Sequence, residues 1–386
     1  MSIQDLDKQY VANTYNRFPV EIVSGKGSVV KDVNGKEYID MGSGIGVTSF
    51  GLCDDVWLEA VVQQASALQH MSNLYYTKPC VMLAQMLCEK TGMKKVFFSN
   101  SGAEANECAI KVARKYAQQK KGKEYSTIVT LENSFHGRTL TTLAATGQEH
   151  YHELFTPLTP SFVHAKANDF DNLKSVCQQN KTAGIMLECI QGEGGVVALQ
   201  ADFVKAVSDY SQENDIVLII DEVQTGNGRT GELYAYMNYG IKPDVVTTAK
   251  GLAGGLPLGA ALLSEKVENV LGFGDHGSTF GGNPISCNAA MSILKRIDEN
   301  LLNEVKEKGK YIFSEFENAD GVESISGMGL MVGIKTVKPA AEVIKKCMEN
   351  GVLCLTAKDK VRLLPALNIK QSDLEKAVKV IKEALI

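Results

Sequence analysis

The 386-residue chain lacks an excess of positive charge, and it lacks any long apolar run. A formal net charge of -5 without a basic cluster argues against a nucleic acid or an anionic membrane as a partner. No segment approaches the roughly 18 consecutive apolar residues that a membrane span needs. The first residues, MSIQDLDKQYVANTY, are polar and acidic, unlike a secretory signal or a transit peptide. We therefore expect a cytoplasmic protein.

The nine cysteines contain no CxxC pair, and their odd number does not suit a complete set of disulfides. Free thiols in a reducing compartment are the natural interpretation, without a zinc site. His150 and His152 form an HxH pair, but no further ligand cluster accompanies them. We interpret both as surface loop residues and expect no metal.

Internal repeats and low-complexity linkers are absent too, so the pattern of apolar residues carries the fold prediction. Between residues 90 and 265, short apolar runs alternate with longer amphipathic stretches. This alternation predicts an α/β fold with a mainly parallel sheet covered on both faces. The runs are residues 96–98, 128–131, 185–187, 216–220, 245–248 and 260–263.

The two ends of the chain differ from this central part. Short strands are predicted at 29–33 and 38–40, and the region after 287 alternates charged amphipathic helices with short strands such as 330–334. We predict a large domain over 53–286, a small α+β domain over 287–386, and an N-terminal segment, 1–52, that joins the small domain. The helices are predicted at 293–308, 340–349 and 372–385.

Each central apolar run ends in a polar cluster. In open α/β sheets, ligands bind at the carboxyl ends of the strands, so these clusters should meet at one site. The convergence favours an enzyme. The clusters are SNSGAEANE, ENSFHGRT, ECIQGEGG, DEVQTGNGRTG and AKGLAGG.

Lys250 ends the strand VVTTAK and is followed by glycines, with no acidic neighbour to pair with it. A buried lone amine gives up its charge, as a lysine that forms a Schiff base must. A surface lysine with its amine in water is the alternative. The residues of the other clusters decide between a Schiff-base lysine and a surface lysine.

Ser101-Gly102-Ala103 is predicted to begin a helix, whose free N–H groups and dipole make an anion site. A serine N-cap with only a structural role is the alternative interpretation of the same residues. Asp221 ends the strand IVLIID and suits a protonated ring nitrogen; a salt-bridged or solvated carboxylate is the alternative.

Phe135 stands in a polar loop, where it suits stacking on a flat ring or filling a core. His136 beside it suits acid–base work or a hydrogen-bonded loop position. Arg138 and Arg362 suit bidentate binding of a carboxylate, or a surface position. Together with Lys250, these features describe pyridoxal phosphate, which carries a phosphate, a basic aromatic ring and an aldehyde.

The motifs resemble the class III pyridoxal-phosphate-dependent aminotransferases over almost the whole chain. That family has the aspartate-aminotransferase-like fold, also called PLP fold type I. The motifs are SGAEANE, SFHGRT, QGEGGV, DEVQTGNGRTG, TTAKGLAGGLPLGA, HGSTFGGNP and RLLPAL.

The resemblance implies that Lys250 bonds to the cofactor and then moves the proton at the reacting carbon. It also implies that Asp221 keeps the pyridinium nitrogen protonated and that Gln224 contacts the ring oxygen. Phe135 and Val223 are expected on opposite faces of the ring.

Gly102 and Ala103 are expected to bind the phosphate through their N–H groups, which Thr279 from the other subunit of a homodimer completes. The resemblance further implies that Ser278 lies near the substrate and that Tyr15 reaches the pocket from the N-terminal segment.

Two substrates must share this pocket. The resemblance implies that Arg138 grips a substrate carboxylate and that Arg362 binds 2-oxoglutarate or glutamate. Glu193 is expected to pair with Arg362 when the other substrate is present.

Within the family, NLYYT and NSFHGRT favour members that act on N-acetylornithine in arginine biosynthesis, with 2-oxoglutarate as the amino acceptor. The related ornithine enzymes usually have a tyrosine where this chain has Gly44-Ile45, which favours an acylated substrate. Succinylornithine, succinyl-diaminopimelate, ornithine and 4-aminobutyrate remain alternatives. A decarboxylase, an aminomutase or a non-catalytic cofactor-binding protein are more distant ones.

Overall fold

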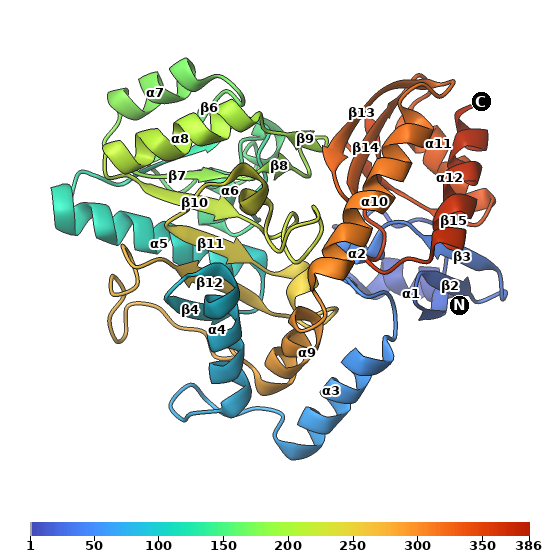
Figure 1. Cartoon of the computed structure of the whole chain (residues 1–386), viewed down its shortest axis with the longest axis horizontal. Helices are drawn as coiled ribbons and strands as arrows, with labels where there is room; N and C mark the ends of the chain where they lie inside the picture. The colour runs from blue at the N-terminus through green and yellow to red at the C-terminus, as the bar shows by residue number, and fades with distance from the viewer. Residues whose placement is uncertain (1) are drawn as a thin grey trace.

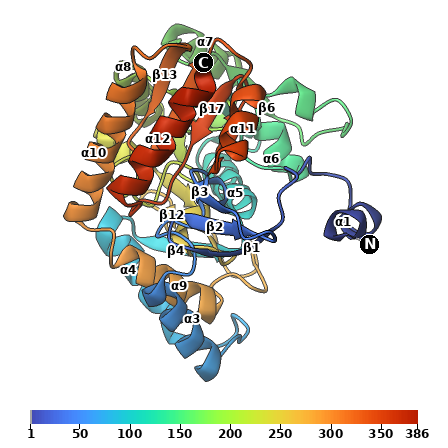
Figure 2. The same ribbon diagram turned by 90° about the vertical axis from the view of Figure 1, so that its right-hand side faces the viewer.

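A computed structural model describes residues 2–386 of the chain. Figure 1 shows two bodies: a central sheet with helices packed around it, and a smaller body in which the first strands lie beside the C-terminal helices. Helix α1 (Ile3–Tyr10) projects from the rest of the chain and has no buried residue (Figure 2). No helix within the described part of the chain is long and apolar enough to cross a membrane.

The larger body is built on a seven-stranded sheet with strand order β4-β12-β11-β10-β7-β5-β6. Strand β12 is antiparallel to both of its neighbours, whereas β11, β10, β7, β5 and β6 form a parallel series. The strands are β4 (Lys95–Ser99), β5 (Thr127–Leu131), β6 (Phe162–Ala165), β7 (Thr182–Leu187), β10 (Val217–Asp221), β11 (Val245–Thr248) and β12 (Gly259–Leu263).

Alternate residues of the central strands enter two different cores. In β10, Ile219 belongs to the core that contains the apolar face of α5 (Gly102–Lys121). Its neighbour Ile220 belongs to the core that contains Phe203 of α8 (Ala201–Glu213). Burial on both faces explains why the strand reads as a continuous apolar run and does not alternate with polar residues.

Further helices and short elements surround this sheet and connect its strands. They are α3 (Asp55–Ala67), α4 (Lys78–Thr91), α6 (Leu140–Ala145), α7 (Phe170–Gln179), α9 (Pro284–Leu294), the 3-10 turns η1 (Glu149–Tyr151), η2 (Ala235–Tyr239) and η3 (Lys250–Leu252), and the hairpin β8 (Ile190–Gln191) and β9 (Val197–Ala198).

The smaller body contains two four-stranded sheets, ordered β1-β2-β3-β15 and β13-β14-β17-β16. Strand β15 lies parallel to β3, and the N–H of Met41 donates to the carbonyl of Leu353 at 2.9 Å. The start and the end of the chain therefore share a sheet. The elements are β1 (Ile22–Lys26), β2 (Val29–Asp32), β3 (Glu37–Asp40), α2 (Ser43–Gly46), α10 (Glu299–Phe316), β13 (Val322–Met328), β14 (Met331–Thr336), α11 (Ala340–Glu349), β15 (Val352–Leu353), β16 (Leu355–Ala357), β17 (Lys360–Leu363) and α12 (Gln371–Leu385).

The observed sheet confirms the predicted α/β class with a mainly parallel sheet. The predicted helix over 293–308 is wrong, because α9 ends at Leu294 and a new helix begins after Asp298. The Asp298 carboxylate accepts the N–H of Leu301 at 2.9 Å, which caps the new helix. Apolar residues keep a helical spacing across the break between α9 and α10, so the sequence pattern did not reveal the break. The domain limits near 52 and 287 stay a prediction.

Candidate active site

The five polar clusters meet at a cavity of about 480 Å³ beside the carboxyl ends of the central strands. Each cluster follows one strand, and the parallel register of the sheet brings their first residues to the same edge. Nine of the predicted site residues line the cavity: Ser101, Gly102, Ala103, Phe135, Arg138, Asp221, Val223, Gln224 and Lys250.

The N-terminus of α5 forms one wall of this cavity. Ser101 caps the helix, and its hydroxyl accepts the N–H of Glu104 at 3.2 Å. The N–H groups of Gly102 and Ala103 have no acceptor within residues 2–386, so they and the helix dipole are free for an anion. A Cβ on Gly102 would lie 2.6 Å from a methyl of Val223, so only glycine fits here.

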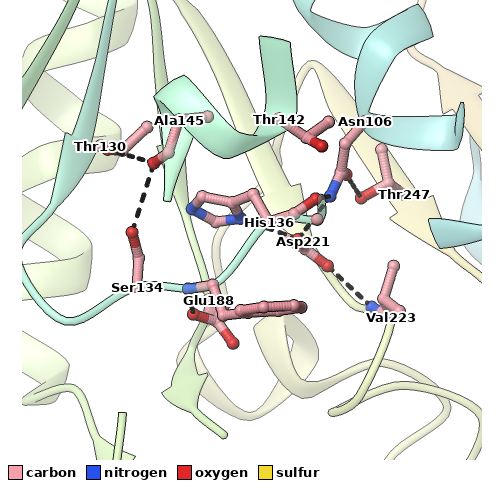
Figure 3. Close-up of polar contacts among 12 residues, drawn as sticks. Asn106, Thr130, Ser134, His136, Thr142, Ala145, Glu188, Asp221, Val223 and Thr247 are labelled. Atoms are coloured by element: carbon pink, nitrogen blue, oxygen red, sulfur yellow. Dashed lines mark hydrogen bonds and ion pairs between the residues drawn. The ribbon is translucent and has the colours of Figure 1, made fainter. Parts of the chain in front are cut away.

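Asp221 lies at the end of β10, buried and held by three donors (Figure 3). Its Oδ2 accepts Nδ2 of Asn106 and Nδ1 of His136, both at 2.8 Å, and its Oδ1 accepts the N–H of Val223 at 3.0 Å. The hydroxyl of Thr247 donates to Oδ1 of Asn106 at 2.6 Å, which fixes the orientation of that amide. These contacts hold the Asp221 carboxylate in one orientation at the cavity wall.

Lys250 begins the short turn η3, where its φ of 44° is left-handed and strained for a residue with a side chain. Its amine lines the cavity and has no hydrogen bond or ion pair within the described chain. Burial lowers the pKa of this amine, and the negative charge of Glu193 opposes that shift only in part. The geometry therefore favours a neutral, nucleophilic amine.

Glu188 is a buried carboxylate in the same cavity, and the sequence analysis gave it no role. Its Oε2 accepts the N–H of Phe135 at 2.9 Å, and its Oε1 accepts the N–H of Gly192 at 3.3 Å. It thus ties the loop of Phe135 to the loop of Glu193. Burial raises the pKa of Glu188 to about 7.

A second group of side chains lies where the smaller body meets the cavity. Arg362 of β17 is buried and donates to Oε1 of Glu193 at 2.5 Å. It also donates to Oε1 of Gln224 at 3.2 Å, and Nε2 of Gln224 donates to Glu193 at 3.2 Å. Burial alone would raise the pKa of Glu193, but the charge and hydrogen bond of Arg362, together with the charge of Lys250 and the hydrogen bond of Gln224, outweigh this and the pKa is lowered.

Arg138 is exposed at the cavity, without an acidic partner or a hydrogen bond among residues 2–386. Its guanidinium carbon lies 5.9 Å from the centroid of the Phe135 ring and 4.7 Å from that of Tyr151. A cation held only by aromatic rings is available to a carboxylate.

Five predicted site residues do not line this cavity within one chain: Glu193 and Arg362, which bond to the lining residue Gln224, and Tyr15, Thr279 and Ser278. Tyr15 is 72% exposed, and Thr279 is exposed at a separate hollow of about 620 Å³. Ser278 lines that second hollow and accepts Nδ2 of Asn100 at 3.2 Å. The single chain therefore leaves Tyr15 and Thr279 away from the cavity.

Sequence reasoning missed Asn106, Thr247 and Glu188, which orient the predicted residues. The signal was present, since Asn106 and Glu188 stand in clusters that had been singled out. Most of their partners lie 30 or more residues away along the chain, so only the fold brings them together. No group of histidine, cysteine or acidic residues in the described chain could hold a metal ion.

These residues fit pyridoxal phosphate. Two unpaired N–H groups at a helix start suit a phosphate, and a buried carboxylate without a lysine or arginine partner suits a protonated ring nitrogen. An aromatic ring and a lone amine complete the set. The chain belongs to the class III aminotransferases, since the profile of that family (Aminotransferase class-III) matches residues 10–385.

Similar proteins support this assignment over the full length. The acetylornithine aminotransferase of Haemophilus ducreyi is 50% identical over 385 residues, which cover 99% of this chain and 98% of that protein. The N-acetylornithine aminotransferase structure from Stenotrophomonas maltophilia has a TM-score of 0.85 at 32% identity, with 98% of this chain and 97% of that chain covered.

A structure of the ornithine aminotransferase of Toxoplasma gondii, described as having partial occupancy of PLP at its active site, superposes with a TM-score of 0.94. The two chains are 30% identical, and the match covers 99% of this chain and 93% of that one. The predicted family and its aspartate-aminotransferase-like fold, PLP fold type I, are confirmed.

Proposed function

We propose that this chain transfers the terminal amino group of N2-acetyl-L-ornithine to 2-oxoglutarate, giving N-acetyl-L-glutamate 5-semialdehyde and L-glutamate, in arginine biosynthesis. The observation that carries this proposal is the pair of arginines on the cavity. Arg138 is free, whereas Arg362 is neutralised by Glu193 at 2.5 Å. Relatives named acetylornithine aminotransferase, 50% and 44% identical, support the same substrate.

The chain is an aminotransferase that uses pyridoxal phosphate. When bound, the cofactor supplies an aldehyde that accepts the amino group and a protonated ring that draws electrons from the reacting carbon. Gly102 and Ala103 would hold its phosphate through their N–H groups. Asp221 would keep its ring nitrogen charged, and Phe135 and Val223 would pack against the ring.

Lys250 moves the proton at the substrate carbon that carries the amine. Its lowered pKa leaves a population of neutral amine near neutral pH, which can accept that proton and return it to a neighbouring atom. Its strained backbone at η3 fixes where the amine points. Gln224, which donates to Glu193 at 3.2 Å, would also contact the ring oxygen of the cofactor.

Two substrates can share one pocket because Arg362 can either pair with Glu193 or be free to bind a substrate carboxylate. When Glu193 is paired with Arg362, the positive charge of Arg362 is neutralised. The neutral acyl group of the amino donor can then lie beside this pair. When Glu193 moves aside, Arg362 binds the second carboxylate of 2-oxoglutarate. A decarboxylase or an aminomutase has no need for this pair.

We further propose a homodimer with shared active sites. An apolar patch is formed by the exposed side chains of the segment 71–82, Met71, Leu74, Tyr75, Tyr76, Val81 and Met82, and by exposed Phe280, whose ring centroid lies 5.5 Å from that of His70. It adjoins Thr279, and Asn73 donates to the carbonyls of Ser278 and Gly281 at 2.9 and 3.0 Å. Large exposed apolar patches mark interaction surfaces. Thr279 of the partner subunit then completes the phosphate site.

The same proposal places the enzyme in the cytoplasm. All nine cysteines are free in the structure, which suits a reducing compartment.

The visible absorbance of the purified holoenzyme tests the proposed substrate. N-acetylornithine should bleach the band of the Lys250-bound cofactor more readily than ornithine or 4-aminobutyrate, and 2-oxoglutarate should restore it. A faster response to either other amine contradicts the substrate and leaves the class intact. Lys250→Ala with normal turnover contradicts the mechanism.

A further inference from the structure

Tyr151 lies at the end of the turn η1, beside Phe135 and Arg138, two of the four residues of the SFHGRT loop that line the cavity. The guanidinium carbon of Arg138 is 4.7 Å from the centroid of the Tyr151 ring. The rings of Tyr151 and Phe135 meet edge to face, with centroids 6.0 Å apart at 67°. One tyrosine thus touches both the free arginine and the aromatic ring of the site.

Arg138 needs such a contact because it has no hydrogen bond or ion pair among residues 2–386, and its guanidinium carbon lies farther from the Phe135 ring, at 5.9 Å, than from the Tyr151 ring. A free arginine side chain has up to about 2 kcal/mol of rotamer entropy to lose on binding. A cation over an aromatic face is stabilised by roughly 0.5–1 kcal/mol at an exposed site. The ring of Tyr151 therefore restricts the guanidinium without occupying its N–H donors, which stay free for a carboxylate.

The turn that carries Tyr151 is itself anchored on both sides. Before it, Nε2 of the buried Gln148 donates to the carbonyl of Ser134 at 3.0 Å, next to Phe135. After it, Nε2 of His152 reaches the carbonyl of Thr146 at 2.7 Å. Since a carbonyl only accepts, that nitrogen carries the hydrogen.

His152 is thus wrongly predicted as a plain surface residue, because its side chain is only 12% exposed. The N–H of Tyr151 donates to the carbonyl of Gln148 at 3.0 Å, which closes the turn between the two anchors. The ring is held against Arg138 by the fold.

We propose that Tyr151 is a positioning residue that holds Arg138 ready for the carboxylate of the amino donor. The ring also supports the tilt of Phe135. This inference rests on the proposed function, in which Arg138 binds that carboxylate. It predicts that Tyr151 contributes to selectivity for amines that carry a carboxylate.

The test compares two amino donors on the holoenzyme with saturating 2-oxoglutarate. N-acetylornithine has the carboxylate, and N-acetyl-1,4-diaminobutane has the same chain without it. Tyr151→Ala should raise KM for N-acetylornithine about fivefold, with a small change in kcat. It should leave KM for N-acetyl-1,4-diaminobutane unchanged, and Tyr151→Phe should behave as the parent enzyme for both donors.

A binding measurement without turnover gives an independent readout. N-acetyl-L-norvaline has the carboxylate and lacks the reacting amine, so its Kd can be measured by calorimetry. Tyr151→Ala should weaken its binding by the same factor. Phe155→Ala, an exposed aromatic of the same loop, is the matched control and should change neither Kd nor KM. Tyr151→Leu fills the space without an aromatic face and replaces alanine if that variant does not fold.

Arg138→Ala separates this inference from the proposed function. If Arg138→Ala leaves KM for N-acetylornithine unchanged, the proposed carboxylate site is wrong. If it raises KM and the Tyr151 variants do not, the role of Tyr151 is overturned. Equal losses with both donors, or the same losses in Phe155→Ala, also overturn it, because they indicate a structural role.

Discussion

At the scale of single residues, the site depends on which atoms form hydrogen bonds with each buried ionisable group. Asp221 receives three hydrogen bonds, one of them from Asn106, whose amide Thr247 fixes. The amine of Lys250 makes none with the described residues. The Asp221 side chain is therefore held in one orientation, whereas burial lowers the pKa of the Lys250 amine and favours its neutral form.

Asp221→Asn should lower kcat by roughly 10²- to 10³-fold, because the amide cannot hold the ring nitrogen protonated. Steady-state kinetics with N-acetylornithine measures this loss. Asp209→Asn, an exposed carboxylate paired with Lys205, is the matched control and should retain full activity. Unchanged kcat in Asp221→Asn would show that its charge is not used.

At the scale of elements, the start of α5 and the end of β10 approach so closely that a glycine is required between them. Gly102→Ala would bring a methyl within 2.6 Å of Val223. We expect this variant to bind pyridoxal phosphate more weakly, because the N–H groups of residues 102 and 103, which are proposed to bind the phosphate, must shift. Fluorescence titration of the apoenzyme measures the affinity.

The double variant Gly102→Ala, Val223→Ala tests the cause of this loss. Removing the Val223 methyls gives the new Cβ room, so affinity should recover in part. If the double variant binds no better than Gly102→Ala alone, the close approach is not the reason for the loss.

A buried carboxylate after β10 makes stability depend on pH. Glu222 accepts the hydroxyl of Thr225 at 2.6 Å and the N–H groups of Ala235 and Tyr236 at 2.9 and 2.8 Å. Burial, which outweighs these bonds, raises its pKa from 4.5 to about 7. Between these values the folded protein keeps a proton that the unfolded chain has lost, so stability falls as pH rises.

Urea denaturation from pH 5 to 8 measures this dependence. Glu222→Gln should be less stable than the parent, since a donor replaces one acceptor oxygen. The free energy of unfolding of the variant should also fall less steeply with rising pH. The slope of the variant should be smaller than that of the parent by up to about 1.4 kcal/mol per pH unit. An unchanged slope would mean that Glu222 does not titrate in this range. Glu315→Gln, which alters a half-exposed surface pair, controls for the loss of a charge.

At the scale of the whole molecule, the site draws residues from both bodies. Arg362 comes from β17 and donates to Glu193 in the turn of the β8–β9 hairpin, so the proposed substrate switch lies between the two bodies. The proposed dimer then adds Thr279 of the partner subunit.

Leu74→Glu places a charge on a side chain that is 88% exposed in the single chain. We expect it to dissociate the dimer in sedimentation experiments and to weaken cofactor binding with it. Val337→Glu alters an exposed valine elsewhere and should leave the dimer intact. If Leu74→Glu sediments as the parent does, the patch is not the interface.

The class of the sheet, its strands and the polar clusters at its edge could all be predicted from the amino-acid sequence alone. These are local signals, because a strand buried on both faces must read as a continuous apolar run and a helix start needs its cap. Motifs over the whole chain also indicated the family. The predicted roles of Lys250 and Asp221 were reached in this way.

The orientation of those residues, by contrast, follows from packing in the folded chain. Glu188 acts on two loops, and Tyr151 acts on Arg138, through contacts that no spacing in the chain encodes. The break between α9 and α10 was missed because one side-chain cap outweighs a continuous apolar pattern. Local patterns follow from the chemistry of neighbouring residues, whereas burial and orientation depend on packing between segments far apart in the sequence.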